Sequence, residues 1–211
     1  MFGEQSMAKI LDFKTKYAPK IFAIDPGFSK SSALGWSMIN VEAELFGGIT
    51  NKPHIDRCGI LKPFSNESNL ATMNDLCDGF IDIWRKDSGY SREPTLLVVE
   101  LPIIYPGSPV AYRCISDLIL FAGMLVKSLS PQMTIMPTPN EWKGNNKKNL
   151  TQESVINGLD FYSKKALERD LESIALDKRH NVFDALGLGI YGGNILAKKQ
   201  PLPRMVYGAK H

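Results

Sequence analysis

Cysteine and histidine are scarce in this chain of 211 residues, which contains three of each. The cysteines Cys58, Cys77 and Cys114 are too few and too scattered for a zinc site or a disulfide framework, so we expect them in the core. The chain lacks an apolar run of the about 18 residues that a membrane span needs. Its first residues also lack the apolar segment of a signal peptide. An odd cysteine count without such a segment is typical of a reducing cytoplasm, so we expect a cytoplasmic protein with no membrane partner.

Nucleotide-binding motifs are absent as well. No G-x-x-x-x-G-K-[ST] sequence occurs, which excludes a P-loop NTPase. An actin-like ATPase or sugar kinase also begins with a strand and a D-x-G turn, but it needs two domains and a second glycine-rich aspartate loop. This chain has neither, so we expect no nucleotide cofactor. The net charge of +3 does not decide whether nucleic acid is bound, because the placement of the lysines matters more.

The chain has the composition of an ordinary globular domain, with 44% hydrophobic and 22% charged residues. Its apolar runs predict five strands, the first three joined as an antiparallel meander. Helical spacing of apolar residues predicts the helices. The predicted strands are 21–25, 33–39, 57–64, 95–100 and 133–138, and the predicted helices are 69–86, 110–129, one or two within 151–171, and 180–197.

This order of elements predicts one mixed α/β sheet, in which the last two strands run parallel to the first and helices cover both faces. We expect one domain over residues 20–197, with a flexible arm at 1–19 and a basic, extended tail at 198–211. Residues 139–150 are predicted to be a polar loop. Asn69 is the expected N-cap of the helix that starts there.

Three acidic residues occupy unusual positions. Asp25 ends the first strand, Glu100 ends the fourth, and Asp184 lies inside the apolar last helix. Each has an ordinary alternative: a turn residue, the first solvated residue after a strand, or an outward-facing helix position. If the two strands are parallel neighbours, however, Asp25 and Glu100 leave the sheet at the same edge. Gly187 and Gly189 would let the last helix bring Asp184 close to the sheet.

Carboxylates gathered in a partly buried site repel one another and need a cation to remain ionised. Hard oxygen ligands suit Mg²⁺, with Mn²⁺ as a substitute. Two such ions are the usual device for phosphodiester hydrolysis. The sequence therefore predicts a metal-dependent phosphodiesterase with Asp25, Glu100 and Asp184 as metal ligands and catalytic residues.

The segments IFAIDPG, LLVVE and DALGLGI resemble those of the RuvC-like Holliday junction resolvases, particularly their phage-encoded relatives. The resemblance covers about residues 20–197, in the same order of elements. It implies the RNase H-like fold with strand order 3-2-1-4-5. It also implies a homodimer that acts in DNA recombination and repair in the bacterial cytoplasm, an endodeoxyribonuclease that nicks two opposing strands of a four-way junction. Asp25, Glu100 and Asp184 match the acidic residues of that family.

The fourth ligand is where the chain departs from the family. The family has Asp or His three residues before the last aspartate, and this chain has Asn181. His180 lies four residues before Asp184 and shares a helix face with it, so His180 is the preferred fourth metal ligand and catalytic residue. Asn181 and Asp177 are the alternatives.

Candidate DNA-binding residues flank these acids. Lys143, Lys147 and Lys148 lie where the family has lysines near the scissile phosphate, although a solvated loop is an equal alternative. Tyr105 follows Glu100 in a proline-rich loop and is a candidate for stacking on a base at the branch. The helix at 110–129 is apolar over much of its circumference, which indicates either a dimer interface or core burial.

Two alternative functions remain open from the sequence. One keeps the chemistry and changes the substrate to a flap, another branched DNA or an RNA–DNA hybrid. The other is a catalytically inactive junction-binding protein, which the asparagine at position 181 favours.

Overall fold

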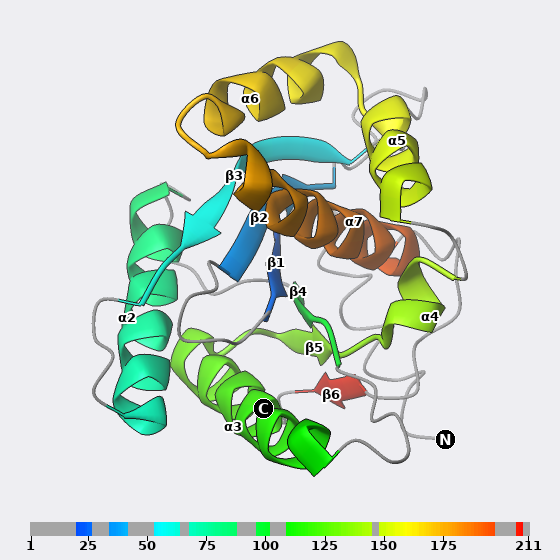
Figure 1. Ribbon diagram of the computed structural model, residues 1–211. Coiled ribbons are helices and arrows are strands. Elements are labelled where there is room, and N and C mark those ends of the chain that lie inside the picture. The colour runs from blue at the N-terminus through cyan, green and yellow to red at the C-terminus, as the bar shows by residue number, and fades with distance from the viewer. Residues whose placement is uncertain are drawn as a thin grey trace.

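A computed structural model gives the architecture of the chain (Figure 1). It describes residues 20–26, 34–41, 53–63, 68–87, 96–101, 109–144, 148–196 and 206–208, with the side chains of 87, 109–114, 148–151 and 206–208 left out. The arm at 1–19, Tyr105, Lys147 and the side chains of Cys114 and Lys148 lie outside this description. No helix within the described ranges combines the length and apolar character needed to span a bilayer.

A mixed sheet organises the fold. Its strands are β1 (Lys20–Asp25), β2 (Leu34–Asn40), β3 (His54–Leu61), β4 (Leu96–Val99), β5 (Met133–Ile135) and β6 (Val206–Gly208). The order across the sheet is β3-β2-β1-β4-β5-β6. β2 runs antiparallel to both β1 and β3, whereas β1, β4 and β5 are mutually parallel. The predicted order 3-2-1-4-5 is thus confirmed.

The sixth strand comes from the C-terminal segment. The sequence predicts this segment to be extended but assigns it to a tail outside the sheet. In the structure β6 pairs antiparallel with β5, with Thr134 opposite Tyr207. A short extended segment carries little periodic signal, so only the tertiary pairing reveals that it belongs to the sheet.

Two helices cover one face of the sheet. α2 (Asn69–Asp87) and α3 (Pro109–Leu129) pack against each other and over the strands. The core beneath them is rich in aromatic rings, with Phe22 contacting Trp84 at 5.4 Å and Phe80 at 5.9 Å between centroids. The alternation of apolar side chains along β1 and β2 supplies the floor of this core.

The last helix, α7 (Arg179–Leu196), crosses the opposite face over β1 and β2 (Figure 1). Eleven of its residues are buried, consistent with its nearly uniform apolar composition. Within the described ranges, the other helical elements are α4 (Pro139–Trp142), α5 (Lys148–Gly158), α6 (Phe161–Leu171) and the 3₁₀ turn η2 (Leu176–Lys178). The loop predicted at 139–150 therefore contains α4 and the start of α5.

Helix α6 covers the outer edge of β3. The Ser163 hydroxyl accepts a hydrogen bond from the Ile55 N–H at 3.1 Å, and the Asp170 carboxylate accepts one from the Cys58 N–H at 2.9 Å. Asp160 caps the helix, accepting from the Ser163 N–H at 2.7 Å. Edge-strand donors that face away from β2 are thereby satisfied by side chains.

Candidate active site at the carboxyl ends of β1 and β4

Asp25 and Glu100 lie on adjacent parallel strands at the same end of the sheet. Ile24 of β1 is in register with Val99 of β4, and each is followed directly by its acidic residue. The Glu100 N–H continues the ladder by donating to the Ile24 carbonyl at 3.4 Å. Neighbouring strands are about 5 Å apart, so the two acidic residues begin from backbone positions at that separation. The predicted juxtaposition of Asp25 and Glu100 is therefore present in the backbone.

Helix α7 brings Asp184 to the same end. Gly35, the residue of β2 opposite Asp25, lies so close to α7 that a Cβ there would overlap the carbonyl oxygen of Asn181. Two residues along β2, the Ser37 hydroxyl donates to the Ala185 carbonyl at 2.9 Å. These contacts place the first turns of α7, including Asp184, over the strand beside Asp25. The negative charge of Asp184 reaches Glu100, whose carboxyl it perturbs.

Two side chains contact the Oε2 atom of Glu100. The Trp142 indole N–H donates to it at 2.6 Å, and the Lys143 ammonium lies 3.6 Å away. Burial raises the pKa of the Glu100 carboxyl above its ordinary value, and the charge of Asp184 adds to this rise. Lys143 and the Trp142 hydrogen bond act in the opposite direction without cancelling it. Moving an ionised carboxylate out of water costs free energy. A cation close to Glu100 would offset this cost.

The residues present fit a hard divalent cation by their chemistry, because Asp25, Glu100 and Asp184 offer only oxygen donors. In the described part of the chain, no three His, Cys, Asp or Glu side chains form a group that could hold a metal ion. The Glu100 carboxylate is engaged by Trp142 and Lys143.

The three candidates for a fourth ligand differ in position. His180 and Asn181 are both half-buried in the first turn of α7, and the Asn181 backbone packs on Gly35. Asp177 belongs to η2, where its side chain is 71% exposed and paired with Lys178 at 3.5 Å. The exposure of Asp177 and its position outside α7 make it the weakest of the three.

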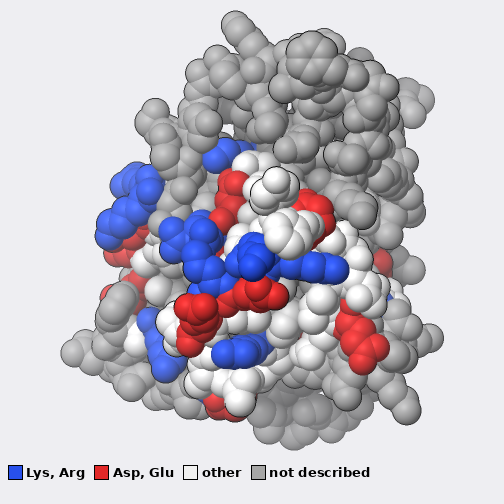
Figure 2. Space-filling model, turned by 90° about the horizontal axis from the view of Figure 1, so that it is seen from above, with Lys and Arg blue, Asp and Glu red and all other residues white. Residues whose placement is uncertain are grey.

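The structure separates the predicted DNA-binding residues. Lys143 lies beside Glu100, whereas Lys148 begins α5. Helix α6 carries three further basic residues, Lys164, Lys165 and Arg169, of which Arg169 is paired with Asp170 at 2.8 Å. On the face that carries α6, basic side chains alternate with acidic ones rather than forming one continuous positive surface (Figure 2).

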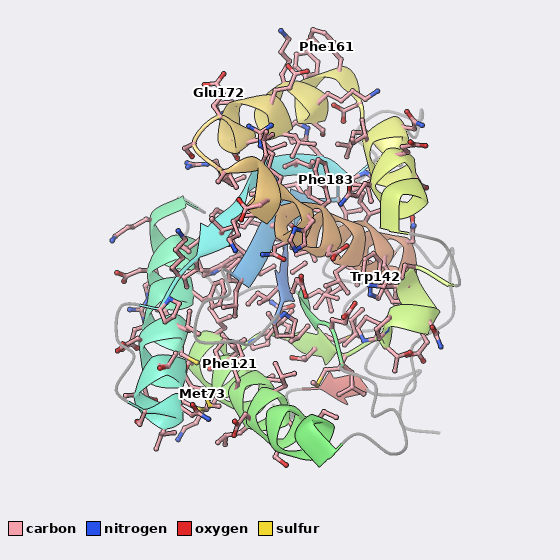
Figure 3. The ribbon with its side chains drawn as sticks, viewed as in Figure 1. Met73, Phe121, Trp142, Phe161, Glu172 and Phe183 are labelled. Carbon is pink, nitrogen blue, oxygen red and sulfur yellow. The ribbon has the colours of Figure 1, made fainter. Side chains whose placement is uncertain are left out.

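Sequence analysis missed Trp142, which extends from α4 toward α7 (Figure 3). Its ring packs where Gly187 has no side chain, since a Cβ on Gly187 would overlap the ring. The sequence predicts that Gly187 lets α7 approach the sheet. Gly189 does so, facing Ile39 and Ser37, but Gly187 makes room for Trp142. The available signal was a tryptophan immediately before the candidate lysine in EWKG.

Solved structures provide similar folds. The chain is similar to Thermus thermophilus RuvC, with 14% identity, a TM-score of 0.57, and coverage of 85% of this chain and 96% of that one. T. thermophilus RuvC in complex with Holliday junction substrate gives 13% identity, a TM-score of 0.59 and coverage of 88% and 99%. The yeast mitochondrial Holliday junction resolvase Ydc2 gives 13% identity, a TM-score of 0.59 and coverage of 91% and 85%.

No protein-family model and no curated protein matches the sequence. The likeness is one of architecture, carried by the strand order, the mixed strand directions and the helices on both faces. The chain therefore has the RNase H-like fold of the RuvC-like Holliday junction resolvases.

Proposed function

We propose that the protein is a divalent-metal-dependent endonuclease that cuts four-way DNA junctions by paired phosphodiester nicks. One observation carries this proposal: Asp25 and Glu100 follow paired residues of adjacent parallel strands, and α7, which bears Asp184, packs on β2 at Gly35, the residue opposite Asp25. The resemblance of the fold to a structure of RuvC in complex with Holliday junction substrate supports the choice of substrate.

Asp25, Glu100 and Asp184 would hold Mg²⁺ or Mn²⁺ as two ions, with His180 or Asn181 completing the set. When bound, the ions supply a water of lowered pKa and stabilise charge on the leaving oxygen. The backbone of Glu100 is held in position, because its N–H continues the hydrogen-bond ladder between β1 and β4. The Lys143 ammonium lies 3.6 Å from the Glu100 carboxylate, and it would contact a phosphate bound beside that carboxylate. Asp184 is held by a helix that is itself fixed to β2 through Ser37.

A second copy of the chain would supply the second nick. The outer side of α3 exposes Ile119 and Leu120, which are 52% and 50% exposed, and Leu70 at the start of α2 is 56% exposed. The Asn69 amide joins these two helices by donating to Asp117 at 2.9 Å. This apolar surface supports a homodimer formed through α3.

The test compares a synthetic four-way junction, a flap, an RNA–DNA hybrid and linear duplex, each with Mg²⁺ or with EDTA. We expect paired nicks on the junction that disappear with EDTA. Asp25→Asn should retain junction binding and lose cutting, because the amide keeps the shape of the side chain without its charge. Asp82→Asn is the matched control, since Asp82 is exposed on α2, is paired with Lys86 and has no proposed role in the site.

Each other result selects an alternative. Preferred cutting of the flap or the hybrid would retain the nuclease and remove the resolvase assignment. Junction binding without metal-dependent cutting of any substrate would indicate an inactive junction-binding protein, the alternative favoured by Asn181 and by the lack of a formed ligand cluster among the described residues.

A further inference from the structure

We propose that Trp142 is a positioning residue, which orients the Glu100 carboxylate toward the cation and ties it to α7. The inference rests on the proposed function, because it assumes that Glu100 is a metal ligand. The Trp142 side chain is uncharged. It is fixed by packing on one side and by a hydrogen bond on the other.

The hydrogen bond to Glu100 is short and one-directional. The Trp142 Nε1–H donates to Oε2 at 2.6 Å in a part-buried setting, where the Glu100 side chain is 17% exposed. The indole nitrogen can only donate a hydrogen bond, so Glu100 Oε2 is always the acceptor in this pair. It also stabilises the ionised carboxylate without neutralising it. Lys143 contacts the same oxygen from 3.6 Å but brings a positive charge, which opposes a bound cation.

The indole ring is immobilised from two directions. Its ring packs against the site of Gly187, one turn after Asp184 on α7, and against the core cluster that contains Leu188 and Tyr191. Its backbone belongs to α4, whose first turn is closed by Glu141: the Oε2 of Glu141 accepts from the Thr138 N–H at 2.7 Å.

Trp142 therefore touches both parts of the proposed site at once. It bonds to Glu100 at the end of β4, and it contacts the helix that carries Asp184. Partners that hold a metal-binding carboxylate in place typically contribute about 10–100-fold to metal affinity or activity. A residue in this position would set the separation of the two ligands rather than take part in the chemistry.

The experiment replaces Trp142 by Phe, which keeps one aromatic ring but removes the indole N–H donor together with the outer ring that packs at Gly187. Mn²⁺ binding is measured by calorimetry without DNA, and kcat and KM are measured on the junction. We expect Mn²⁺ to bind about 10-fold more weakly or worse, and kcat to fall with KM for DNA little changed. Trp84→Phe is the matched control, since Trp84 is buried on the opposite face of the sheet and should leave both unchanged.

Tryptophan fluorescence gives a second readout that does not depend on turnover. Mn²⁺ should quench the emission of the wild type and of Trp84→Phe, and the quench should be lost in Trp142→Phe. Gly187→Ala, which pushes the ring aside without altering its donor, should also weaken Mn²⁺ binding. Gly158→Ala is its control, because a Cβ at Gly158 meets no atom within 4 Å.

The outcomes separate the two proposals. Wild-type Mn²⁺ affinity and wild-type kcat in Trp142→Phe would overturn the positioning role and leave the nuclease intact. A wild-type protein that binds no Mn²⁺ and cuts no DNA would overturn both. Urea unfolding of every variant verifies that a loss of binding is not a loss of folding.

Discussion

Carboxylate side chains help to hold helix α6 against strand β3. Asp160 is the clearest case, because it accepts from both the N–H and the hydroxyl of Ser163, at 2.7 and 3.1 Å. Ser163 in turn accepts from the Ile55 N–H of β3. One carboxylate thus starts α6 and orients the serine that joins the helix to the strand.

The charge of Asp160 gives this junction a pH dependence. Burial raises the pKa of the Asp160 carboxyl, but the hydrogen bonds from Ser163 and the nearby His54 outweigh it, so the pKa lies below its ordinary value of 3.8. A depressed pKa stabilises the folded state above 3.8, and this contribution is lost as the pH falls through the folded pKa. Asp160→Ala should lower the free energy of unfolding at pH 7 by about 1 kcal/mol, with the difference from wild type shrinking in acid.

Urea unfolding at a series of pH values measures this effect. Asp82→Ala is the control, because Asp82 is 62% exposed and its pair with Lys86 on α2 should contribute little. A constant difference between wild type and Asp160→Ala down to the acid limit would contradict the role of the charge.

Sequence patterns anticipated those residues whose chemistry is unusual for their position. Asp25 and Glu100 end apolar strands and Asp184 interrupts an apolar helix, so each was visible in the sequence. Cys58 and Cys77 are buried as expected, and burial raises the pKa of each thiol to about 12.

The role of Trp142 could not be predicted from the sequence, because its partners Glu100 and Gly187 are 42 and 45 residues away and no local pattern relates them. The expected N-cap Asn69 is also replaced, since the Ser68 hydroxyl accepts from the Ala71 N–H.

At the scale of elements, the approach of α7 to β2 determines where Asp184 lies. Gly35 is essential to it, because a Cβ at that position would overlap the Asn181 carbonyl, which is backbone and cannot move alone. Gly189 has softer neighbours in the side chains of Ile39 and Ser37. The helix therefore rests on β2 most tightly at the end nearest the candidate site.

Gly35→Ala should consequently lift the first turns of α7. We expect the free energy of unfolding to fall by about 1–3 kcal/mol, the range for overpacking of a close contact. The same substitution at Gly158, which has open space, should leave stability nearly unchanged. Urea unfolding of both variants makes the comparison, and equal stabilities would show that α7 does not need this close contact.

Element boundaries were predictable where periodicity was strong and missed where it was weak. The helix predicted at 180–197 is observed at Arg179–Leu196, and that at 69–86 at Asn69–Asp87. β3 was predicted at 57–64 but spans His54–Leu61. Its first three residues include the polar His54 and Asp56 on either side of Ile55, and their strand geometry depends on pairing with β2 and contact with α6. Tertiary contacts therefore decide the start of this strand.

At the scale of the whole molecule, α3 should decide the oligomeric state. Ile119→Glu together with Leu120→Glu places charges on the exposed apolar side of α3 without altering its buried face. We expect the wild type to be a dimer and the double variant a monomer, measured by sedimentation or light scattering. Phe161→Glu is the control, because Phe161 is 67% exposed on the outer side of α6 (Figure 3).

A wild-type monomer at every concentration would contradict this interface. A variant that stays dimeric would place the contact elsewhere on the molecule. If the double variant Ile119→Glu, Leu120→Glu is a monomer, it should still bind metal, because all the candidate ligands come from a single copy of the chain.

The side chains that satisfy the outer donors of β3 also influence how two copies can meet. A bare strand edge invites another strand to add to the sheet, and such growth has no natural end. At β3 the hydroxyl of Ser163 and the carboxylate of Asp170 already occupy those donors. At these two positions the edge of β3 is closed to a further strand, so α6 protects this side of the sheet against open-ended growth.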